Sequence, residues 1–281
     1  MTNDQAICIR TIDYSETSQV ATFFTRQTGK VTVIAKGAKR PRWPFGGPIE
    51  MFSYGKIVFS DSGRDKLATL VEFEPLAGVA DSSVLAGDIF VLNCCLFAAE
   101  LVNSLTKDYD PHPGLFDSML RFFRDVSQRK IPNADRADVL SRLVLFQLEL
   151  LREIGLYPVL EHCVNCKNPF SVRWPEVYFS NNAKGLICRD CQGPFPDKIR
   201  LTQQGAKCLA DLLALALLWR GSAGLSGVAQ AKSEAHKAKV DAKLPASAED
   251  RTVRQVEDIL IRYITEALGR PPKMAKFILN P

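Results

Sequence analysis

Two closely spaced cysteine pairs place the strongest constraint on how this chain folds. The first pair is Cys163 and Cys166, the second is Cys188 and Cys191, and 21 residues separate the pairs. A C-x2-C turn presents two sulfurs on the same side, so an arm of this length lets four thiolates converge on one ion. The spacing therefore predicts one structural Zn²⁺ with all four cysteines as ligands.

Two disulfides, or free thiols in a core, are the alternatives for such a cluster. The chain begins Met-Thr-Asn-Asp, without the basic and apolar regions of an export signal. We therefore expect a cytoplasmic protein, and thiols stay reduced in that compartment. Four sulfur ligands leave no position for water, so we expect a structural ion rather than metal catalysis.

Five short β-rich segments precede the cysteines. Alternating apolar residues form them, and turn sequences such as Thr28-Gly29 and Lys36-Gly37 delimit them. The segments are 5–12, 18–25, 30–36, 52–60 and 67–73. Five strands of this length indicate a small β-barrel, which we place at residues 1–78.

Basic residues gather on the third of these segments and in the loop after it. Between residues 26 and 42 the chain has six basic residues and no acidic one: Arg26, Lys30, Lys36, Lys39, Arg40 and Arg42. This density suits a polyanion, and the rings of Trp43 and Phe45 are suited to stacking on bases. The alternatives are a solvated basic loop and rings that cap the barrel core. We expect the six basic residues to bind DNA.

Helical periodicity dominates the rest of the chain. Apolar residues recur every three or four positions in five segments, at about 81–105, 115–129, 134–154, 202–219 and 250–268. We expect Asp81 or Ser82 to cap the first helix and Thr202 to cap the fourth. A short hairpin at 177–187 carries the arm between the cysteine pairs.

These segments predict an all-α domain with an inserted zinc module, so the complete protein is of the α+β class. The predicted boundaries are 79–158 and 195–281 for the helical domain and 159–194 for the zinc module. Residues 221–249 are rich in Gly, Ala, Ser and Lys, which predicts a flexible insertion.

Composition and motif searches exclude several functional classes. With 46% hydrophobic residues, 24% charged residues and a net charge of +5, the 281-residue chain has an ordinary globular composition. It lacks the G-x-x-x-x-G-K-[ST], G-x-S-x-G and H-E-x-x-H sequences of nucleotide-binding and hydrolytic sites. No apolar run is long enough to span a membrane. We therefore expect a protein that is not an enzyme.

Several short sequences, in this order, resemble the RecO family of bacterial recombination mediators. They are IRTIDYSE at 9–16, FTRQTGK at 24–30, AKGAKRP at 35–41, GLYP at 155–158, YFS at 178–180, GLIC at 185–188 and LGR at 268–270. The matches extend over nearly the whole chain. Each is short, but their number and order make the resemblance specific.

The resemblance implies an OB-fold followed by a helical domain with a zinc module. It also implies binding to single- and double-stranded DNA, annealing of strands coated with single-strand-binding protein, and cooperation with RecR in loading RecA. The helical domain would contact the acidic C-terminal tail of single-strand-binding protein. The resemblance also implies that this chain is a cytoplasmic, nucleoid-associated bacterial protein. Two alternatives are a zinc-ribbon adaptor that binds only proteins and a DNA enzyme that requires a divalent ion.

Overall fold

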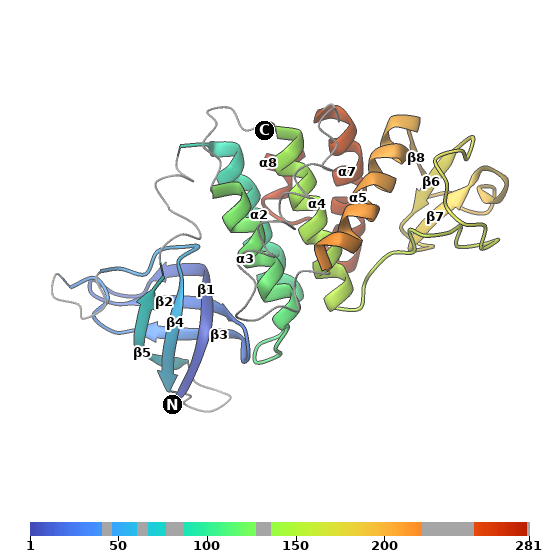
Figure 1. Cartoon of the computed structure of the whole chain (residues 1–281). Coiled ribbons are helices and arrows are strands. Elements are labelled where there is room, and N and C mark those ends of the chain that lie inside the picture. Colours follow the sequence, from blue (N-terminus) through green and yellow to red (C-terminus); the bar gives the residue numbers. More distant parts are fainter. Residues whose placement is uncertain (41–46, 61–66, 77–86, 128–135, 221–249, 280–281) are drawn as a thin grey trace. The chain divides into compact units, whose positions relative to one another are not determined.

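The chain divides into two compact units, Met1–Lys130 and Ile131–Pro281. The structure is a computed structural model that describes residues 1–40, 47–60, 67–76, 87–127, 136–220 and 250–279. Figure 1 labels the elements of both units in chain order. The predicted boundary at 78/79 and the predicted insertion at 221–249 lie outside the described residues. The division of the chain into three predicted domains stays a prediction.

Unit 1 is built on a closed five-stranded barrel with the strand order β1-β2-β3-β5-β4. The strands are β1 (Thr2–Asp13), β2 (Gln19–Thr25), β3 (Gly29–Ala35), β4 (Tyr54–Ser60) and β5 (Ala68–Pro75). Strands β3 and β5 pair in parallel, and the other neighbours pair antiparallel. The five predicted strands and the predicted OB-type barrel are confirmed.

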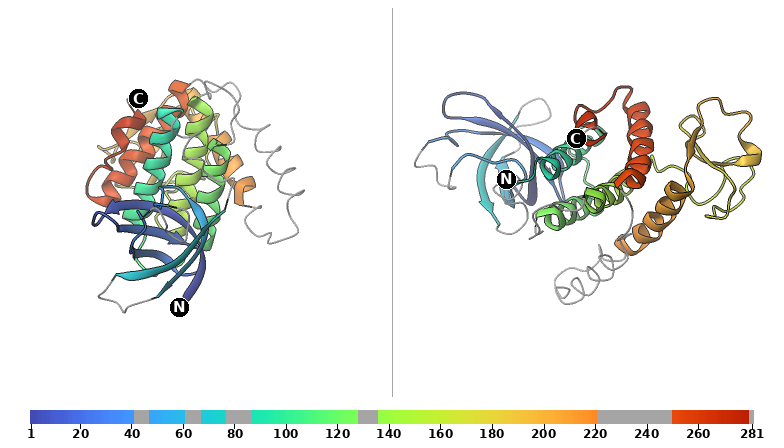
Figure 2. Two further views of the ribbon diagram at one scale, coloured as in Figure 1. Left: turned by 90° about the vertical axis from the view of Figure 1, so that its left-hand side faces the viewer. Right: turned by 90° about the horizontal axis from the view of Figure 1, so that it is seen from above.

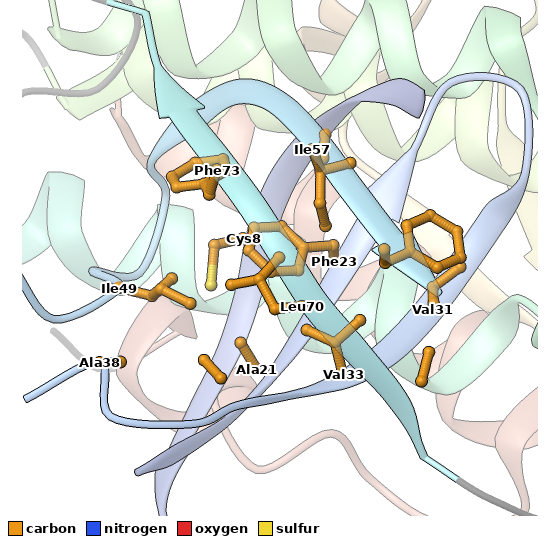
Figure 3. Close-up of a cluster of buried hydrophobic side chains, with 14 residues drawn as sticks. Cys8, Ala21, Phe23, Val31, Val33, Ala38, Ile49, Ile57, Leu70 and Phe73 are labelled. Carbon is orange, nitrogen blue, oxygen red and sulfur yellow. The ribbon is translucent and has the colours of Figure 1, made fainter. Parts of the chain in front are cut away.

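Inward-facing apolar side chains fill the barrel. Burial alternates along β3, as expected for a strand with one face in a core. Figure 3 shows the resulting cluster of 14 buried side chains, which come from all five strands and from the segment after β3. Within it the rings of Phe23 and Phe73 lie 5.2 Å apart, between centroids. This core leaves the outward side chains of the strands free for other contacts.

Two helices of unit 1 pack on the outside of the barrel. They are α2 (Ile89–Leu105) and α3 (Pro113–Ser127). The ring of Phe24 on β2 lies 6.1 Å from that of Phe116 on α3, and both side chains are fully buried. Helix α2 begins later than expected, because Asp88 forms its N-cap and accepts hydrogen bonds from two backbone N–H groups. The predicted caps Asp81 and Ser82 lie outside the described residues.

Unit 2 combines helices with a small antiparallel sheet of order β7-β6-β8. Its described elements are α4 (Arg136–Glu153), β6 (Val177–Ser180), β7 (Gly185–Cys188), the 3-10 helix η1 (Arg189–Cys191), β8 (Ile199–Leu201), α5 (Gln203–Arg220), α7 (Asp250–Leu268) and α8 (Ala275–Leu279). Figures 1 and 2 show α4, α5 and α7 packed side by side. The hairpin β6–β7 and the helices of this unit confirm the sequence prediction.

Two contacts attach the sheet and the chain before it to helix α7. The rings of Phe179 on β6 and Tyr263 on α7 meet edge to face with centroids 5.8 Å apart. The Tyr263 hydroxyl also donates to the carbonyl oxygen of Leu156 at 3.0 Å.

Thr202 caps α5 as predicted, since its hydroxyl accepts the N–H of Gly205 at 3.0 Å. No helix within the described residues is long and apolar enough to cross a lipid bilayer.

Candidate functional site

The four predicted cysteines of unit 2 come together at one point. Cys163 and Cys166 lie in the turn before the sheet, Cys188 ends β7, and Cys191 ends η1. Their Sγ atoms all lie within 4.8 Å of one another, and those of Cys166 and Cys188 are 3.7 Å apart. Zn–S bonds of about 2.3 Å in a tetrahedral site place ligand sulfurs about 3.8 Å apart. The donor set and its spacing therefore fit a metal ion.

Backbone hydrogen bonds form the first cysteine turn and hold it against β7. The N–H of Cys163 donates to the oxygen of Asn168 at 2.9 Å, and the N–H of Lys167 donates to the oxygen of Cys163 at 3.0 Å. Lys167 adopts a left-handed conformation with φ of 62°, which reverses the chain. The N–H of Val164 donates to the oxygen of Leu186 at 2.8 Å, so the two cysteine pairs are brought together through the backbone.

Polar contacts act directly on the sulfurs. The Asn165 side-chain amide donates to Cys191 Sγ at 3.3 Å, which stabilises negative charge there. Burial alone would raise the pKa of the Cys163 thiol. Hydrogen bonds from backbone N–H groups have the larger combined effect, so the pKa is lowered to about 7. At Cys188 burial dominates and raises the pKa to about 12. A bound cation would favour the thiolate at both positions, so metal binding would release protons.

The other four cysteines are buried core residues. Cys8, Cys94, Cys95 and Cys208 are all buried. Burial raises the thiol pKa of Cys8 and of Cys208 to about 12, so both stay protonated and unreactive near neutral pH.

Two of the six basic residues expected to bind DNA are committed to contacts within unit 1. The Arg26 guanidinium donates two hydrogen bonds to the carboxylate of Asp117, at 3.0 and 2.9 Å, and this partner raises its pKa. The Lys30 side chain is only 11% exposed, and its Nζ donates to the carbonyl oxygens of Asn103 and Thr106. These contacts favour structural roles for Arg26 and Lys30.

Three other basic residues lie together after β3. Lys36 and Arg40 are exposed, and no described residue forms an ion pair with either. The Lys39 ammonium lies 2.5 Å from the carboxylate of Asp13. Arg42 lies outside the described residues, as do the aromatic residues at 43 and 45. DNA binding by all six basic residues stays a prediction.

The structure adds two exposed residues that the sequence reading did not select. Arg10 on β1 is exposed and has no ionic partner within the described residues, and Tyr14, just after β1, is 65% exposed. Alternation along a strand places positions 10, 12 and 14 on one face. This alternation is the sequence signal from which both residues could be identified.

Comparison with known proteins assigns the chain to a family. The family model "Recombination protein O N terminal" matches residues 1–79, and "Recombination protein O C terminal" matches residues 86–276. The chain belongs to the RecO family. The four-cysteine cluster lies within the match to the C-terminal RecO model, and the barrel lies within the match to the N-terminal one.

Individual RecO proteins support the assignment. The "DNA repair protein RecO" of Bacillus subtilis (strain 168) is 31% identical over 209 residues, which cover 74% of this chain and 76% of the relative. The protein of the same name from Anaeromyxobacter dehalogenans (strain 2CP-C) is 33% identical over 212 residues, with 74% and 76% covered. These bacterial relatives confirm the resemblance to RecO, a family of DNA repair and recombination proteins.

Proposed function

We propose that this RecO-family protein binds DNA through a basic surface of the barrel, formed chiefly by Lys36 and Arg40, with Lys39 beside them in an ion pair with Asp13. The observation that carries the proposal is that Lys36 and Arg40 are exposed cations without an anionic partner in the described part of the chain. Such cations can neutralise phosphates and release the counterions condensed on them. Arg42 belongs to the same proposal by its position in the sequence. Arg26, Lys30 and Lys39 contribute less, because their charged groups are already paired.

We further propose that Cys163, Cys166, Cys188 and Cys191 hold one Zn²⁺. The sulfur separations support this ligand set, and four sulfurs complete a tetrahedral site. The role is structural: the ion crosslinks the turn before β6 to the turn after β7. The predicted zinc module at 159–194 would then act as one rigid part of the helical domain at 79–158 and 195–281.

The proposed activity is pairing of complementary strands without nucleotide hydrolysis, so we do not propose an enzyme. Two single strands repel each other through their phosphates, and a protein that holds both at a basic surface raises their local concentration. We propose that the protein binds single- and double-stranded DNA and acts in the bacterial cytoplasm, at the nucleoid. Its proposed partners are RecR, the C-terminal tail of single-strand-binding protein and, indirectly, RecA.

The DNA surface is tested by removing two of its charges. We expect Lys36→Gln combined with Arg40→Gln to weaken binding to all sequences and to reduce the slope of log affinity against log salt by about 0.7 per lost contact on single strands. The matched control, Lys107→Gln with Lys207→Gln, removes two exposed positive charges elsewhere. Fluorescence anisotropy at several salt concentrations measures both. Equal affinities for the two double variants would place the DNA surface elsewhere.

The same measurements separate the proposal from a zinc-ribbon adaptor, which predicts no salt-dependent DNA binding by the parent protein. Annealing is tested with complementary labelled oligonucleotides in the absence of ATP. We expect the protein to raise the pairing rate, and we expect this effect to decrease as salt rises. A requirement for ATP, or a rate equal to that without protein, would contradict the proposed activity.

A further inference from the structure

The four clustered cysteines of unit 2 differ in their access to solvent. Cys166 is exposed and Cys191 is partly exposed, whereas Cys163 and Cys188 are buried. The susceptibility of a cysteine to oxidation follows its thiolate character and its exposure, and a cysteine that binds a metal ion does so as a thiolate. An oxidant in solution therefore reaches the sulfur of Cys166 before the other three.

A second sulfur lies close enough to react with an oxidised Cys166. The Sγ atoms of Cys166 and Cys188 are 3.7 Å apart, and a disulfide bond is about 2 Å long, so the two sulfurs need to approach each other by about 1.7 Å. Cys166 lies in the turn before the sheet, and Cys188 ends β7. A bond between them would link the two cysteine pairs.

Backbone contacts that do not involve the sulfurs join the first cysteine turn to β7. The N–H of Val164 donates to the oxygen of Leu186 at 2.8 Å, and the N–H of Leu186 donates to the oxygen of Val159 at 2.9 Å. The packing is tight, because a Cβ atom at Gly185 would lie 2.5 Å from the oxygen of Val159 and 2.7 Å from Cγ1 of Val164. The two turns are therefore held next to each other while the sulfurs change partners.

We propose that Cys166 is the site at which a hydroperoxide, such as hydrogen peroxide, oxidises the four-cysteine cluster, and that the product is a disulfide between Cys166 and Cys188. The inference rests on the proposed zinc site and specifies how that site responds to an oxidant. The exposure of Cys166 selects the first sulfur to react, and the separation of 3.7 Å selects its partner.

The reaction has two steps, in which the two sulfurs together lose two electrons. First the thiolate of Cys166 attacks one peroxide oxygen and the O–O bond breaks. Cys166 becomes a sulfenic acid, and the hydroxide that leaves takes up a proton to give water. The thiolate of Cys188 then attacks the Cys166 sulfur, so the S–S bond forms and the S–O bond breaks. The second hydroxide also takes up a proton, and hydrogen peroxide is reduced to two molecules of water.

The disulfide removes two of the four sulfur donors from the cluster. Two sulfurs bind Zn²⁺ much more weakly than four, so oxidation should release the ion. The new bond links the same two turns that the ion would crosslink, so unit 2 should stay folded. A dithiol should then restore the cluster by thiol–disulfide exchange. The cluster is therefore a crosslink that responds reversibly to peroxide.

The test treats the reduced, zinc-loaded parent protein with equimolar hydrogen peroxide. A chromogenic chelator reports the released zinc, with a sample lacking peroxide as the control. After alkylation of the remaining thiols, tandem mass spectrometry of a tryptic digest identifies the disulfide, since Arg189 separates Cys188 from Cys191. We expect loss of the bound zinc together with a linked peptide pair that joins Cys166 to Cys188. Dithiothreitol and Zn²⁺ should restore the zinc content.

Two matched variants test the order of the steps. Cys188→Ser and Cys191→Ser each remove one sulfur of the cluster, but only Cys191→Ser keeps both proposed partners. We expect Cys191→Ser to form the disulfide as the parent does. We expect Cys188→Ser to accumulate a sulfenic acid at Cys166, which dimedone traps. Should circular dichroism show that either variant is misfolded, the disulfide map of the parent decides alone.

The outcomes separate this inference from the proposed zinc site. Zinc in the untreated parent, combined with a different disulfide such as Cys163–Cys166 or with no oxidation, would overturn the inference and leave the zinc site in place. A parent without zinc would contradict the zinc site, and its disulfide map would still decide whether Cys166 and Cys188 pair.

Discussion

The ammonium group of Lys30 on β3 donates a hydrogen bond to the carbonyl oxygen of Asn103, in the last turn of α2, at 2.8 Å. A second bond of 2.9 Å goes to the oxygen of Thr106, the C-cap residue of the same helix. The last carbonyl groups of a helix lack donors within the helix, and a cation there also interacts favourably with the helix dipole. Lys30 therefore holds α2 against the barrel.

We expect Lys30→Met to lower the free energy of unfolding of unit 1 by about 1–3 kcal/mol, because two carbonyl oxygens lose a charged donor. The matched control is Lys36→Met, whose side chain is exposed and should change stability by less than about 0.5 kcal/mol. Urea unfolding followed by circular dichroism measures both. Equal stability of the two variants would show that the contact to α2 contributes nothing.

Gly29 on β3 lies close to the backbone of Asp110, in the segment after α2. A Cβ atom at Gly29 would lie 2.3 Å from the carbonyl oxygen of Asp110, and its φ is +85°. Gly47 has a φ of +132° but no atom within 4 Å of such a Cβ. We expect Gly29→Ala to destabilise unit 1 by at least about 2 kcal/mol more than Gly47→Ala, since only the former adds a clash with backbone. A smaller difference in urea unfolding would mean that the segment moves away easily.

The metal site predicts one Zn²⁺ per chain in the purified protein. We expect Cys166→Ser to reduce the zinc content and to lower the unfolding temperature of unit 2, because such binding contributes on the order of 10 kcal/mol to the folding of small zinc modules. The control Cys208→Ala alters a buried thiol in α5 and should leave the zinc content unchanged. Elemental analysis and differential scanning calorimetry measure these effects. A parent protein without zinc would contradict the assignment.

Glu257 on α7 predicts a stability that depends on pH. Its carboxyl is fully buried, and Gln147 Nε2 on α4 donates to it at 2.5 Å. The pKa of Glu257 is raised from the ordinary 4.5 to about 8, chiefly by burial; the bond from Gln147 opposes this rise, and the charge of Asp258 adds to it. Two oxygens of this pair, Gln147 Oε1 and Glu257 Oε2, are buried without a hydrogen-bond partner among the described residues.

The folded protein then keeps this proton up to about pH 8, whereas the unfolded chain releases it near pH 4.5. The free energy of unfolding of unit 2 should therefore fall as pH rises through this window, by an amount on the order of a few kcal/mol. Glu257→Gln should remove most of this dependence, and Glu266→Gln on the exposed face of the same helix should not. Urea unfolding between these pH values measures it, and parallel curves for parent and Glu257→Gln would contradict the prediction.

Features that depend on neighbours in the sequence could be predicted without the structure. The two cysteine turns follow from local spacing, so the ligand set could be named before the sulfurs were seen to converge. The strands and helices follow from the period of the apolar residues, and helix α5 begins after Thr202 because a hydroxyl at that position satisfies a nearby N–H group. The start of α2 was predicted too early, because several acidic and hydroxyl residues before the helix could serve as its N-cap and Asp88 is the one that does.

The tertiary structure decided which charged groups are available, because ion pairs join residues far apart in the chain. Charge density in the sequence treats Arg26 and Lys36 alike, but folding brings Asp117 to Arg26 and leaves Lys36 in solvent. The exposure of Arg10 and Tyr14 depends likewise on the register of three strands and on where the helices stop covering them. The sequence by itself determined the elements and the metal ligands through local interactions, whereas long-range packing selected the cations that remain free for a polyanion.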